Sequence, residues 1–249
     1  MPPFRVSDLP FRARLTYAAH AFKAIAKQHH KEMLPLLRRL LEPDMVVFDV
    51  GGHSGQFAKL FARLVPRGRV YSFEPSGYAL SILRRAVAWN RLDNVTTLRM
   101  GLGDAPGELT LETPVKAHGG RRFGLAHFGP GGDGRRRVGE TVPVGTIDGV
   151  VADRGLTRLD LIKMDIEGWE LRALTGGRVS IARFRPIILV ELEESHLARA
   201  EDTLESAWAT LTAWGYRPFV WLGGEDLEPL AQPRNGDAVW LPESHPLAE

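Results

Sequence analysis

The chain contains no cysteine, which excludes disulfide bonds and thiolate metal sites and suits a reducing compartment. It also lacks any apolar run near the ~20 residues that a membrane-spanning helix needs. Its first residues do not contain the uninterrupted apolar stretch of a secretory signal peptide. With 249 residues, 44% of them hydrophobic, the chain can bury a sizeable core, most simply as one α/β domain. We therefore expect a soluble protein of the cytoplasm.

Net charge is also small, at +2, but it is distributed unevenly. The first 40 residues form an arm in which basic residues greatly outnumber acids. This basic arm could contact an anionic membrane surface, bind nucleic acid or pair with a second copy as a homodimer. Because arginine outnumbers lysine along the whole chain, we favour a solvated helical face, packed on the domain through Leu15, Phe22, Ile25 and Leu34. Residues 1–40 carry only Asp8 and Glu32 as acids, against Arg5, Arg12, Arg14, Lys23, Lys27, Lys31, Arg38 and Arg39.

Hydrophobic periodicity divides the chain into a helical arm, residues 1–43, and one domain, residues 44–249. Strands and helices alternate in the domain, which implies parallel strands joined by right-handed crossovers, with an antiparallel pair at the end. Ser54 is the expected N-cap of the first domain helix. An insertion at about 108–145 breaks the alternation with two short antiparallel strands around a long loop. The seven strands expected in the main sheet are 45–50, 69–73, 95–100, 159–164, 186–191, 216–222 and 238–241.

A glycine turn follows the first of these strands and is the most informative feature of the sequence. The strand ends at Asp49, and Gly51, Gly52 and Gly55 follow. Glycine lets the backbone take φ > 0 and approach a ligand closely. Glu74 lies at the tip of the next strand, about 20 residues beyond the turn, where ribose hydroxyls need an acceptor. The pattern predicts a site for a nucleoside cofactor.

The spacing of the glycines favours S-adenosylmethionine over a dinucleotide. A dinucleotide fingerprint reads G-x-G-x-x-G and lays pyrophosphate on the helix N-terminus, whereas the glycines here read G-G-x-x-G. Asp49 would repel pyrophosphate but would suit the cationic amino group of a methionine moiety. His53, inside the turn, is expected to brace the backbone rather than to act as a catalyst.

Several motifs beyond the turn occur in one order and spacing: Phe-Glu-Pro (73–75), Thr-Ile-Asp (146–148) and Leu-Ile-Lys-Met-Asp-Ile-Glu-Gly-Trp-Glu (161–170). With Asp-Val-Gly-Gly-His-Ser-Gly (49–55), they make the chain resemble the FkbM-type methyltransferases from about residue 44 to 193. The resemblance implies a class I methyltransferase Rossmann-like fold: a mostly parallel seven-stranded sheet with helices on both faces, plus the helical arm and a β-hairpin insertion. Gly52, His53 and Ser54 depart from the residues usual in that family.

The resemblance also implies the activity and the site. The family uses S-adenosylmethionine to methylate a hydroxyl of a small molecule, sugar or glycan. By resemblance, the turn holds the methionine end, Glu74 with Pro75 takes the ribose, and Gly101 and Leu102 border the adenine. The cofactor-binding residues implied are Asp49, Gly51, Gly52, His53, Ser54, Gly55, Glu74, Pro75, Gly101, Leu102 and Asp165.

Methyl transfer needs positioning and removal of the acceptor's proton. Asp165 and Glu167 are the nearest candidates for that proton, and Lys163 lies on the same face of its strand as Asp165. Glu170 is interpreted as an acid that favours a helix N-terminus. An alternative is Mg²⁺ held by Asp165 with Glu191 or Glu193, but no spacing demands a metal, and none is assigned.

The loop within 113–140 is expected to cover the acceptor site, with His118 or His127 as a second base. Its Arg135, Arg136 and Arg137 suggest an acidic acceptor, while a solvated surface insertion is an equal alternative. A nucleic-acid methyltransferase is disfavoured because the chain has no Asn/Asp-Pro-Pro-aromatic motif for gripping a flipped base. A non-catalytic module that only binds S-adenosylmethionine is the remaining alternative.

Overall fold

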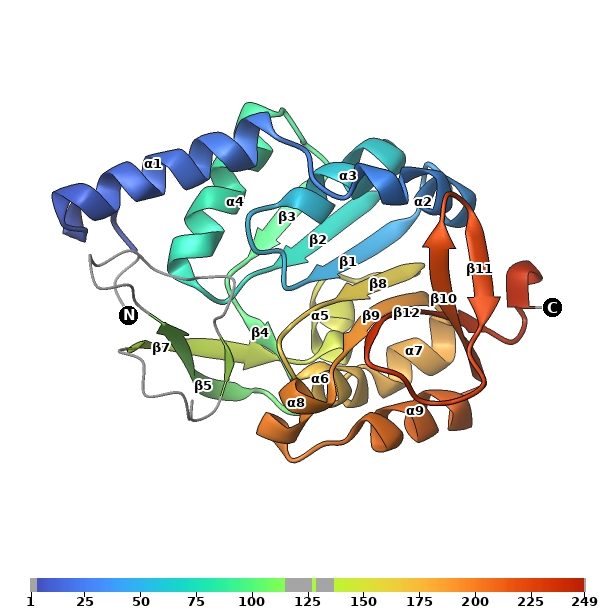
Figure 1. The fold of residues 1–249 in the computed structure, drawn as a ribbon. Coiled ribbons are helices and arrows are strands. Elements are labelled where there is room, and N and C mark those ends of the chain that lie inside the picture. The colour runs from blue at the N-terminus through green and yellow to red at the C-terminus, as the bar shows by residue number, and fades with distance from the viewer. Residues whose placement is uncertain (1–3, 115–126, 129–136, 249) are drawn as a thin grey trace.

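A computed structural model describes residues 4–114, 127–128 and 137–248. Its centre is an eight-stranded sheet in the order β11-β10-β12-β9-β8-β1-β2-β3 (Figure 1). Neighbouring strands from β9 to β3 pair in parallel, whereas β12, β10 and β11 pair antiparallel. The strands are β1 Val46–Val50, β2 Arg69–Phe73, β3 Val95–Leu98, β8 Leu161–Met164, β9 Ile187–Leu192, β10 Tyr216–Gly223, β11 Asp226–Pro229 and β12 Gly236–Pro242.

The prediction of a mostly parallel sheet with an antiparallel end is confirmed, but the number of strands was wrong by one. The missed strand, β11, turns back from β10 at Gly223 and Gly224, both of which have positive φ. Its four residues, Asp-Leu-Glu-Pro, lie at the outer edge of the sheet and are mostly exposed. A short, polar edge strand gives no hydrophobic alternation for a sequence pattern to detect.

Helices cover both faces of the sheet, as expected (Figure 1). One group of helices, mostly from the N-terminal part of the chain, lies over one face, and a second group, from the C-terminal part, lies over the other. Among the described residues no helix is long and apolar enough to cross a bilayer. The first group is α1 Phe11–Ala26, α2 Leu34–Leu40, α3 Gln56–Leu64 and α4 Gly77–Trp89; the second is α5 Ile147–Asp153, α6 Glu170–Thr175, α7 Arg178–Phe184 and α9 Leu204–Ala213, with the short α8 Glu194–Leu197 before it.

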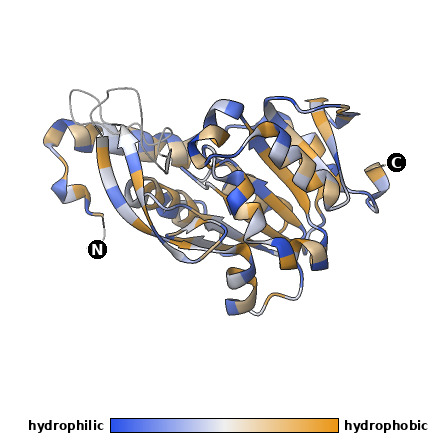
Figure 2. Ribbon diagram, turned by 90° about the horizontal axis from the view of Figure 1, so that it is seen from below, coloured by the Kyte–Doolittle hydropathy of each residue, from blue (hydrophilic) through white to orange (hydrophobic). Residues whose placement is uncertain are grey.

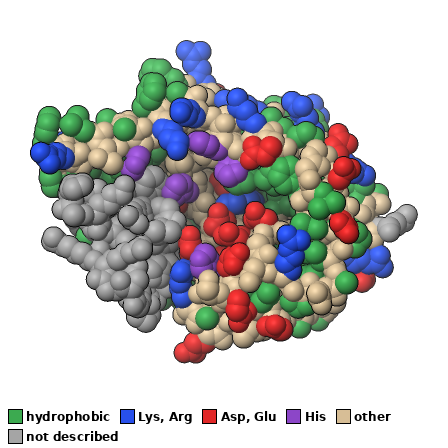
Figure 3. Space-filling view, viewed as in Figure 1, with side chains coloured by type: hydrophobic (Ala, Val, Ile, Leu, Met, Phe, Trp, Pro, Cys, Tyr) green, Lys and Arg blue, Asp and Glu red, His purple; other side chains and the backbone are tan. Residues whose placement is uncertain are grey.

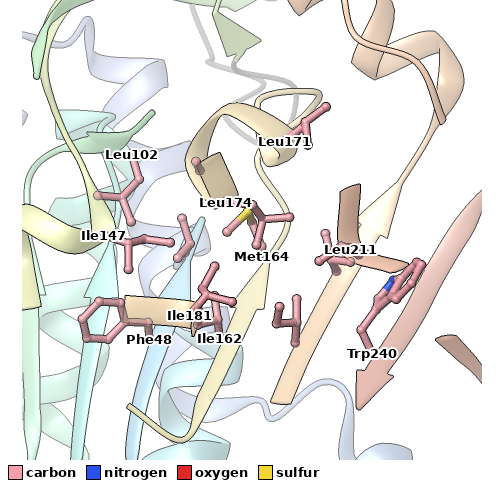
Figure 4. Packing of buried hydrophobic residues seen from close by; sticks show 14 of the residues in the cluster. Phe48, Leu102, Ile147, Ile162, Met164, Leu171, Leu174, Ile181, Leu211 and Trp240 are labelled. Carbon is pink, nitrogen blue, oxygen red and sulfur yellow. The ribbon is translucent and has the colours of Figure 1, made fainter. Parts of the chain in front are cut away.

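The core follows the period-two alternation of the strands. Phe48, Ile162 and Ile188 point to the face covered by α5, α6, α7 and α9, where they join one buried cluster with Trp240 (Figure 4). Val47 and Leu161, one position earlier in each strand, join a second cluster with α2 and α3 on the opposite face. Figure 2 shows the resulting apolar interior of the sheet between more polar helices. Both faces of the central strands are therefore buried, which explains their nearly continuous apolar sequences.

The basic arm packs on the domain through only some of the residues expected. Ile25 and Leu34 are partly buried against the domain, as predicted. Leu15 and Phe22 are 58% and 70% exposed, so the prediction that they anchor the arm was wrong. The buried residues of α1 are Ala13, Tyr17, Ala21 and Ala24, which pack against Tyr78 and Ile82 of α4. Small side chains let the two helices approach closely, and such a face gives a weaker hydrophobic signal than Leu and Phe do.

The described residues between 101 and 145 include a second sheet rather than a simple hairpin, with its strands in the order β4-β7-β5-β6. Its main pair, β5 and β7, is antiparallel along eight residue pairs. His118, Arg135 and Arg136 lie outside the described residues, and only the backbone of His127 and Arg137 is described. The strands are β4 Gly101–Leu102, β5 Gly107–Pro114, β6 His127–Phe128 and β7 Arg137–Gly145.

The strand order places a switch point between β1 and β8. From β1 the chain moves outward through β2 and β3, and it later returns to the other side of β1 with β8 and β9. The chain leaves β1 toward one side of the sheet and leaves β8 toward the other. A crevice therefore opens at the carboxyl ends of β1 and β8. The glycine turn follows β1 and Asp165 follows β8, so both lie at this crevice.

Candidate cofactor and methyl-transfer site

The glycine turn is held by backbone hydrogen bonds. The N–H groups of Gly51 and Gly52 both donate to the carbonyl oxygen of Phe73, at 3.0 and 2.8 Å, which ties the turn to the end of β2. Gly55 donates to the Gly52 carbonyl at 2.8 Å and is the N-cap of α3, with φ of 82°. Ser54 is therefore not the cap that the sequence suggested, because the left-handed residue that begins the helix is the glycine after it.

Each glycine of the turn is required by its surroundings. A Cβ on Gly51, whose φ is +80°, would lie 2.0 Å from the carbonyl oxygen of Asp165. A Cβ on Gly52 would lie 2.1 Å from the hydroxyl of Ser72. Gly55 packs against Leu83, whose Cδ1 would be 2.7 Å from an added Cβ. The bare backbone of Gly51 and Gly52 faces the cavity, as close approach of a ligand requires.

A cavity lies beside this turn and gathers most of the predicted site residues. Figure 3 shows a hollow in this face of the molecule, with acidic side chains gathered around it and histidines along its border. Asp49 and Gly55, two of the predicted residues, do not line the cavity. Those that do are Gly51, Gly52, His53, Ser54, Glu74, Pro75, Gly101, Leu102, Lys163, Asp165 and Glu167.

Asp49 lies beneath the turn and is completely buried. Its Oδ2 accepts a hydrogen bond from the Ser72 hydroxyl at 2.7 Å, whereas its Oδ1 has no partner among the described residues. Burial raises the pKa of Asp49, and Lys163 and the Ser72 hydroxyl oppose that rise. A buried carboxylate this close to Gly52 supports the turn. Its direct contact with the amino group of a methionine moiety stays a prediction.

Glu74 is the acid at the end of β2, and it lines the cavity. Its Oε2 accepts from the N–H of His53 at 2.8 Å and its Oε1 from the N–H of Ser76 at 2.9 Å. Burial raises the pKa of Glu74 to about 7, although both backbone hydrogen bonds favour the ionised form. The glycine turn and the start of α4 are thus fixed through one carboxyl group, which is where the sequence placed a ribose acceptor.

His53 has a left-handed backbone, with φ of 47°, inside the turn. Burial, with Lys163 as the second cause, lowers the pKa of His53 to about 4. The ring is therefore neutral at physiological pH and is a weak base. This supports the interpretation of His53 as a residue that shapes the turn.

Asp165 and Lys163 bring opposite charges to the other side of the cavity. Lys163 is almost buried, its Nζ lying 3.6 Å from Oδ2 of Asp165 and 4.9 Å from the centre of the Phe57 ring. The Asp165 side chain is 47% exposed. Of the two acids proposed for proton removal, it is the one whose carboxylate remains accessible.

Glu167 is less exposed than Asp165, and its carboxylate has other partners. Its Oε2 lies 3.4 Å from a guanidinium nitrogen of Arg199 and 3.5 Å from Nδ1 of His196. The backbone of Glu167 is left-handed, with φ of 60°, and Gly168 follows at φ of 108°. These ion pairs hold the strained turn after β8, so Glu167 fits a positioning role better than proton transfer.

Glu170 also stabilises the turn after β8, residues 166–168. Its Oε1 accepts from the N–H groups of Ile166 and Gly168, at 2.9 and 3.2 Å. Burial raises the pKa of Glu170 to about 7. Helix α6 begins at Glu170, because residues 166–168 form this turn.

Glu191 was considered only as a metal ligand, yet it contacts Asp165 directly. It lies at the end of β9, next to β8 in the sheet. Burial and the neighbouring Asp165, with which it shares a hydrogen bond, raise the pKa of Glu191 to about 8. Glu191 therefore keeps its proton to higher pH than an isolated glutamate and can donate it in the hydrogen bond with Asp165.

Asp237, opposite Glu191 in the β9–β12 register, adds a further acid. Within the described ranges no group of three or more histidine and acidic side chains is arranged to hold a metal ion.

Sequence reasoning missed eight residues that line the cavity: His30, Val50, Gln56, Phe57, Phe73, Met100, Leu111 and Ile166. His30 comes from the arm and Leu111 from the second sheet, so no local pattern connects either with the turn. Phe57 lies on α3 in line with Leu60, Phe61 and Leu64, a spacing that indicates a residue facing the core. Its position, two residues after Gly55, is the one signal that could have placed it beside the cavity.

The fold and the site together define a class of enzyme. A mostly parallel sheet with a glycine turn at its switch point, and an acid at the end of the adjacent strand, is the arrangement that binds a nucleoside cofactor. Glu74 is in place to accept from ribose hydroxyls, and the bare backbone of the turn leaves room beside it, so the residues present fit S-adenosylmethionine. The protein is an S-adenosylmethionine-dependent methyltransferase.

Comparison with known proteins places it more closely. A family model described as the methyltransferase FkbM domain matches residues 49–218, so the chain belongs to the FkbM methyltransferase family. It is similar to the 2-O-methyltransferase NoeI of Sinorhizobium fredii, with 24% identity over 71% of this chain and 74% of that protein. It is also similar to the AMB antimetabolite synthetase AmbE of Pseudomonas aeruginosa, with 30% identity over 60% of this chain, which is 8% of AmbE.

A solved structure supports the fold alone. The methyltransferase FkbM of Methylobacillus flagellatus is 17% identical, with a TM-score of 0.54. The similarity covers 94% of this chain and 56% of that one.

Proposed function

We propose that the protein transfers the methyl group of S-adenosylmethionine to a hydroxyl oxygen of an uncharged, hydroxyl-rich small molecule or sugar, and that Asp165 takes the hydroxyl proton. The acceptor oxygen attacks the sulfonium methyl carbon, the carbon–sulfur bond breaks, and S-adenosylhomocysteine leaves. The observation that carries this proposal is the accessible carboxylate of Asp165 inside the cavity, across from the glycine turn.

Glu191 supports this role of Asp165. A protonated Glu191 that donates to Asp165 fixes the orientation of the Asp165 carboxylate and leaves its other lone pairs for the acceptor. General bases of this kind contribute about 10²- to 10⁴-fold to rate. Lys163 Nζ, 3.6 Å from Oδ2 of Asp165, adds a positive charge beside the carboxylate.

The charges around the cavity favour a neutral acceptor over an acidic one. Asp165 and Asp237 lie on either side of Glu191, where the ends of β8 and β9 meet the start of β12, and the negative charges of the two aspartates would repel an anionic acceptor. Carboxylates that accept from several hydroxyls suit a sugar, and NoeI is by name a 2-O-methyltransferase. The arginines that suggested an acidic acceptor, Arg135 and Arg136, lie outside the described residues, so that alternative stays a prediction.

Methyl transfer can be tested with S-adenosylmethionine carrying ¹³C in its methyl group. The protein is incubated with fractionated extract and with panels of neutral sugars, uronic acids and RNA. The ¹³C shift of any product then distinguishes an O-methyl from an N-methyl group. We expect an O-methyl product from a neutral hydroxyl compound. An N-methyl product, a methylated nucleic acid, or tight cofactor binding without transfer to any fraction would reject the proposal in favour of the alternatives.

A further inference from the structure

Helix α1 has two apolar faces, and only one of them packs on the protein. Ala13, Tyr17, Ala21 and Ala24 are buried against α4. On the opposite side Phe11, Leu15 and Phe22 are 74%, 58% and 70% exposed. Residues 11, 15 and 22 fall on one side of a helix because four and seven residues correspond to about one and two turns. Together with Ala18, Ala19 and Ala26, all exposed, they form what we call the outer face of α1.

Basic side chains flank this outer face. Arg12 and Lys23 project along one of its edges and Arg14 along the other, and all three are exposed. Helix α1 contains no aspartate or glutamate. Figure 3 shows hydrophobic and basic side chains side by side over the part of the surface that α1 occupies in Figure 1.

Trp89, which is 75% exposed, adds an aromatic side chain near the end of α1. It is the last residue of α4, and the amide of the next residue, Asn90, donates to the carbonyl oxygen of Ile25 at 3.4 Å. Aromatic rings of this kind are typical of surfaces that meet the headgroup region of a bilayer.

We propose that the outer face of α1 docks the protein on an anionic lipid surface. An apolar stripe of Phe and Leu with Lys and Arg at its edges is the pattern of a helix that lies in the plane of the membrane interface. Pairing between two copies of this face is less favourable, because it would bring the basic edges together and α1 has no acid to neutralise them. Nucleic acid would meet the large apolar side chains at the centre of the face. The inference does not depend on the proposed acceptor.

The helix is held rigidly in the docking position. Nζ of the buried Lys59 donates to the carbonyl oxygens of Ala24 and Lys27, each at 2.6 Å, which caps the end of α1 with a cation. The Tyr17 hydroxyl lies 2.8 Å from that of Ser81, and the Tyr17 ring packs edge-on against Tyr78. A preformed face does not have to fold when it binds, which reduces the entropic cost of binding.

The arm also connects the outer face with the cavity. Only a few residues separate the end of α1 from His30, which lines the cavity. A membrane bound along α1 would therefore hold this border of the cavity close to the lipid headgroups.

Vesicle sedimentation tests the proposal with the full chain. Vesicles of phosphatidylcholine alone are compared with vesicles containing one quarter phosphatidylglycerol, at low salt and at high salt. We expect binding to the anionic vesicles, at least tenfold weaker binding to the neutral ones, and weakening by salt. The variant Leu15→Ser/Phe22→Ser should lose about tenfold or more in affinity. Arg12→Glu/Lys23→Glu should lose more than about 25-fold, since each Lys or Arg near such a surface contributes about fivefold and the variant removes two of them.

Two equally exposed hydrophobic residues away from α1 provide the matched control. Val179→Ser/Leu222→Ser removes side chains that are 70% and 63% exposed, and it should leave vesicle binding unchanged. All variants change surface residues, so their circular dichroism and thermal unfolding should match the parent chain. The proposal is overturned if the parent chain does not sediment with anionic vesicles, or if the control variant loses as much binding as Leu15→Ser/Phe22→Ser. It is also overturned if light scattering without lipid shows a dimer that the α1 variant converts to a monomer.

Discussion

At the scale of single residues, Asp165 and Glu167 are two positions apart but have different surroundings. Asp165 is accessible in the cavity and shares a hydrogen bond with Glu191. Glu167 is paired with Arg199 and His196 and has a left-handed backbone. The sequence offered both as bases, and the contacts now separate them: the accessible acid suits proton removal, and the paired acid suits support of the turn.

Replacement of Asp165 by Asn tests this distinction. We expect Asp165→Asn to lower kcat by about 100-fold or more, because the amide cannot accept the acceptor's proton. The affinity for S-adenosylhomocysteine, measured by calorimetry, should change by less than about threefold, since positioning of the cofactor does not require the charge. Glu167→Gln is the comparison, and its kcat should fall less. Equal losses in the two variants, or a kcat that Asp165→Asn leaves intact, would contradict the assignment.

Gly51 offers a second test at this scale. Gly51→Ala would place a Cβ 2.0 Å from the Asp165 carbonyl oxygen, at φ of +80°. Gly155→Ala is the matched control, because Gly155 also has positive φ, +59°, but has nothing within 4 Å of an added Cβ. The control should cost about 1 kcal/mol in unfolding free energy from backbone strain alone.

Gly51→Ala should cost more than about 2 kcal/mol, because the turn must also shift. It should also abolish measurable binding of S-adenosylhomocysteine, which Gly155→Ala should retain. Denaturant unfolding and calorimetry on both variants give these values. Similar results for the two would mean that the close approach to Asp165 is unimportant.

At the scale of the elements, the turn after β8 depends on a buried acid. Glu170 accepts two backbone N–H groups of residues 166–168 and thereby closes the turn that carries Glu167. Strand β8 and helix α6 were predictable from periodicity, but the turn between them was not, because its shape comes from a carboxyl group that follows it in sequence. The insertion was misjudged for a related reason: β4 and β7 pair across many intervening residues.

The raised pKa of Glu170 predicts a pH dependence of stability. Its pKa is about 7 in the folded protein, against an ordinary value of 4.5. Between these values the folded state binds more protons than the unfolded state, so this contribution to stability is complete at low pH and is lost as pH rises toward 7. The loss is up to about 3 kcal/mol at pH 8.

Glu170→Gln isolates that contribution, because an amide oxygen can still accept from Ile166 and Gly168 without carrying a charge. Relative to the parent chain, the variant should become more stable as pH rises from 5 to 8, as measured by denaturant unfolding at each pH. The other raised groups, such as Glu74, are present in both proteins and cancel. A difference between the two proteins that does not change with pH would contradict the account.

At the scale of the whole molecule, sequence reasoning located the residues of the cavity that directly follow a strand. The turn, Glu74 and Asp165 each follow a recognisable strand, and parallel pairing brings the ends of those strands together. It failed where contacts are distant: His30 and Leu111 reach the cavity from the arm and from the second sheet. It also misjudged Leu15 and Phe22, because periodicity reveals that a helix has an apolar face but not which of two faces is covered.

The most direct test of the central claim is hydrogen–deuterium exchange with and without S-adenosylhomocysteine. The account holds that the cofactor occupies the crevice between the glycine turn, the end of β2 and β4. We predict slower exchange in peptides that cover residues 51–56, 73–77 and 100–103, and unchanged exchange in the β10–β11 hairpin at the far edge of the sheet. NADH at the same concentration should protect none of these segments. Protection by NADH, or protection by S-adenosylhomocysteine that leaves residues 51–56 unchanged, would contradict it.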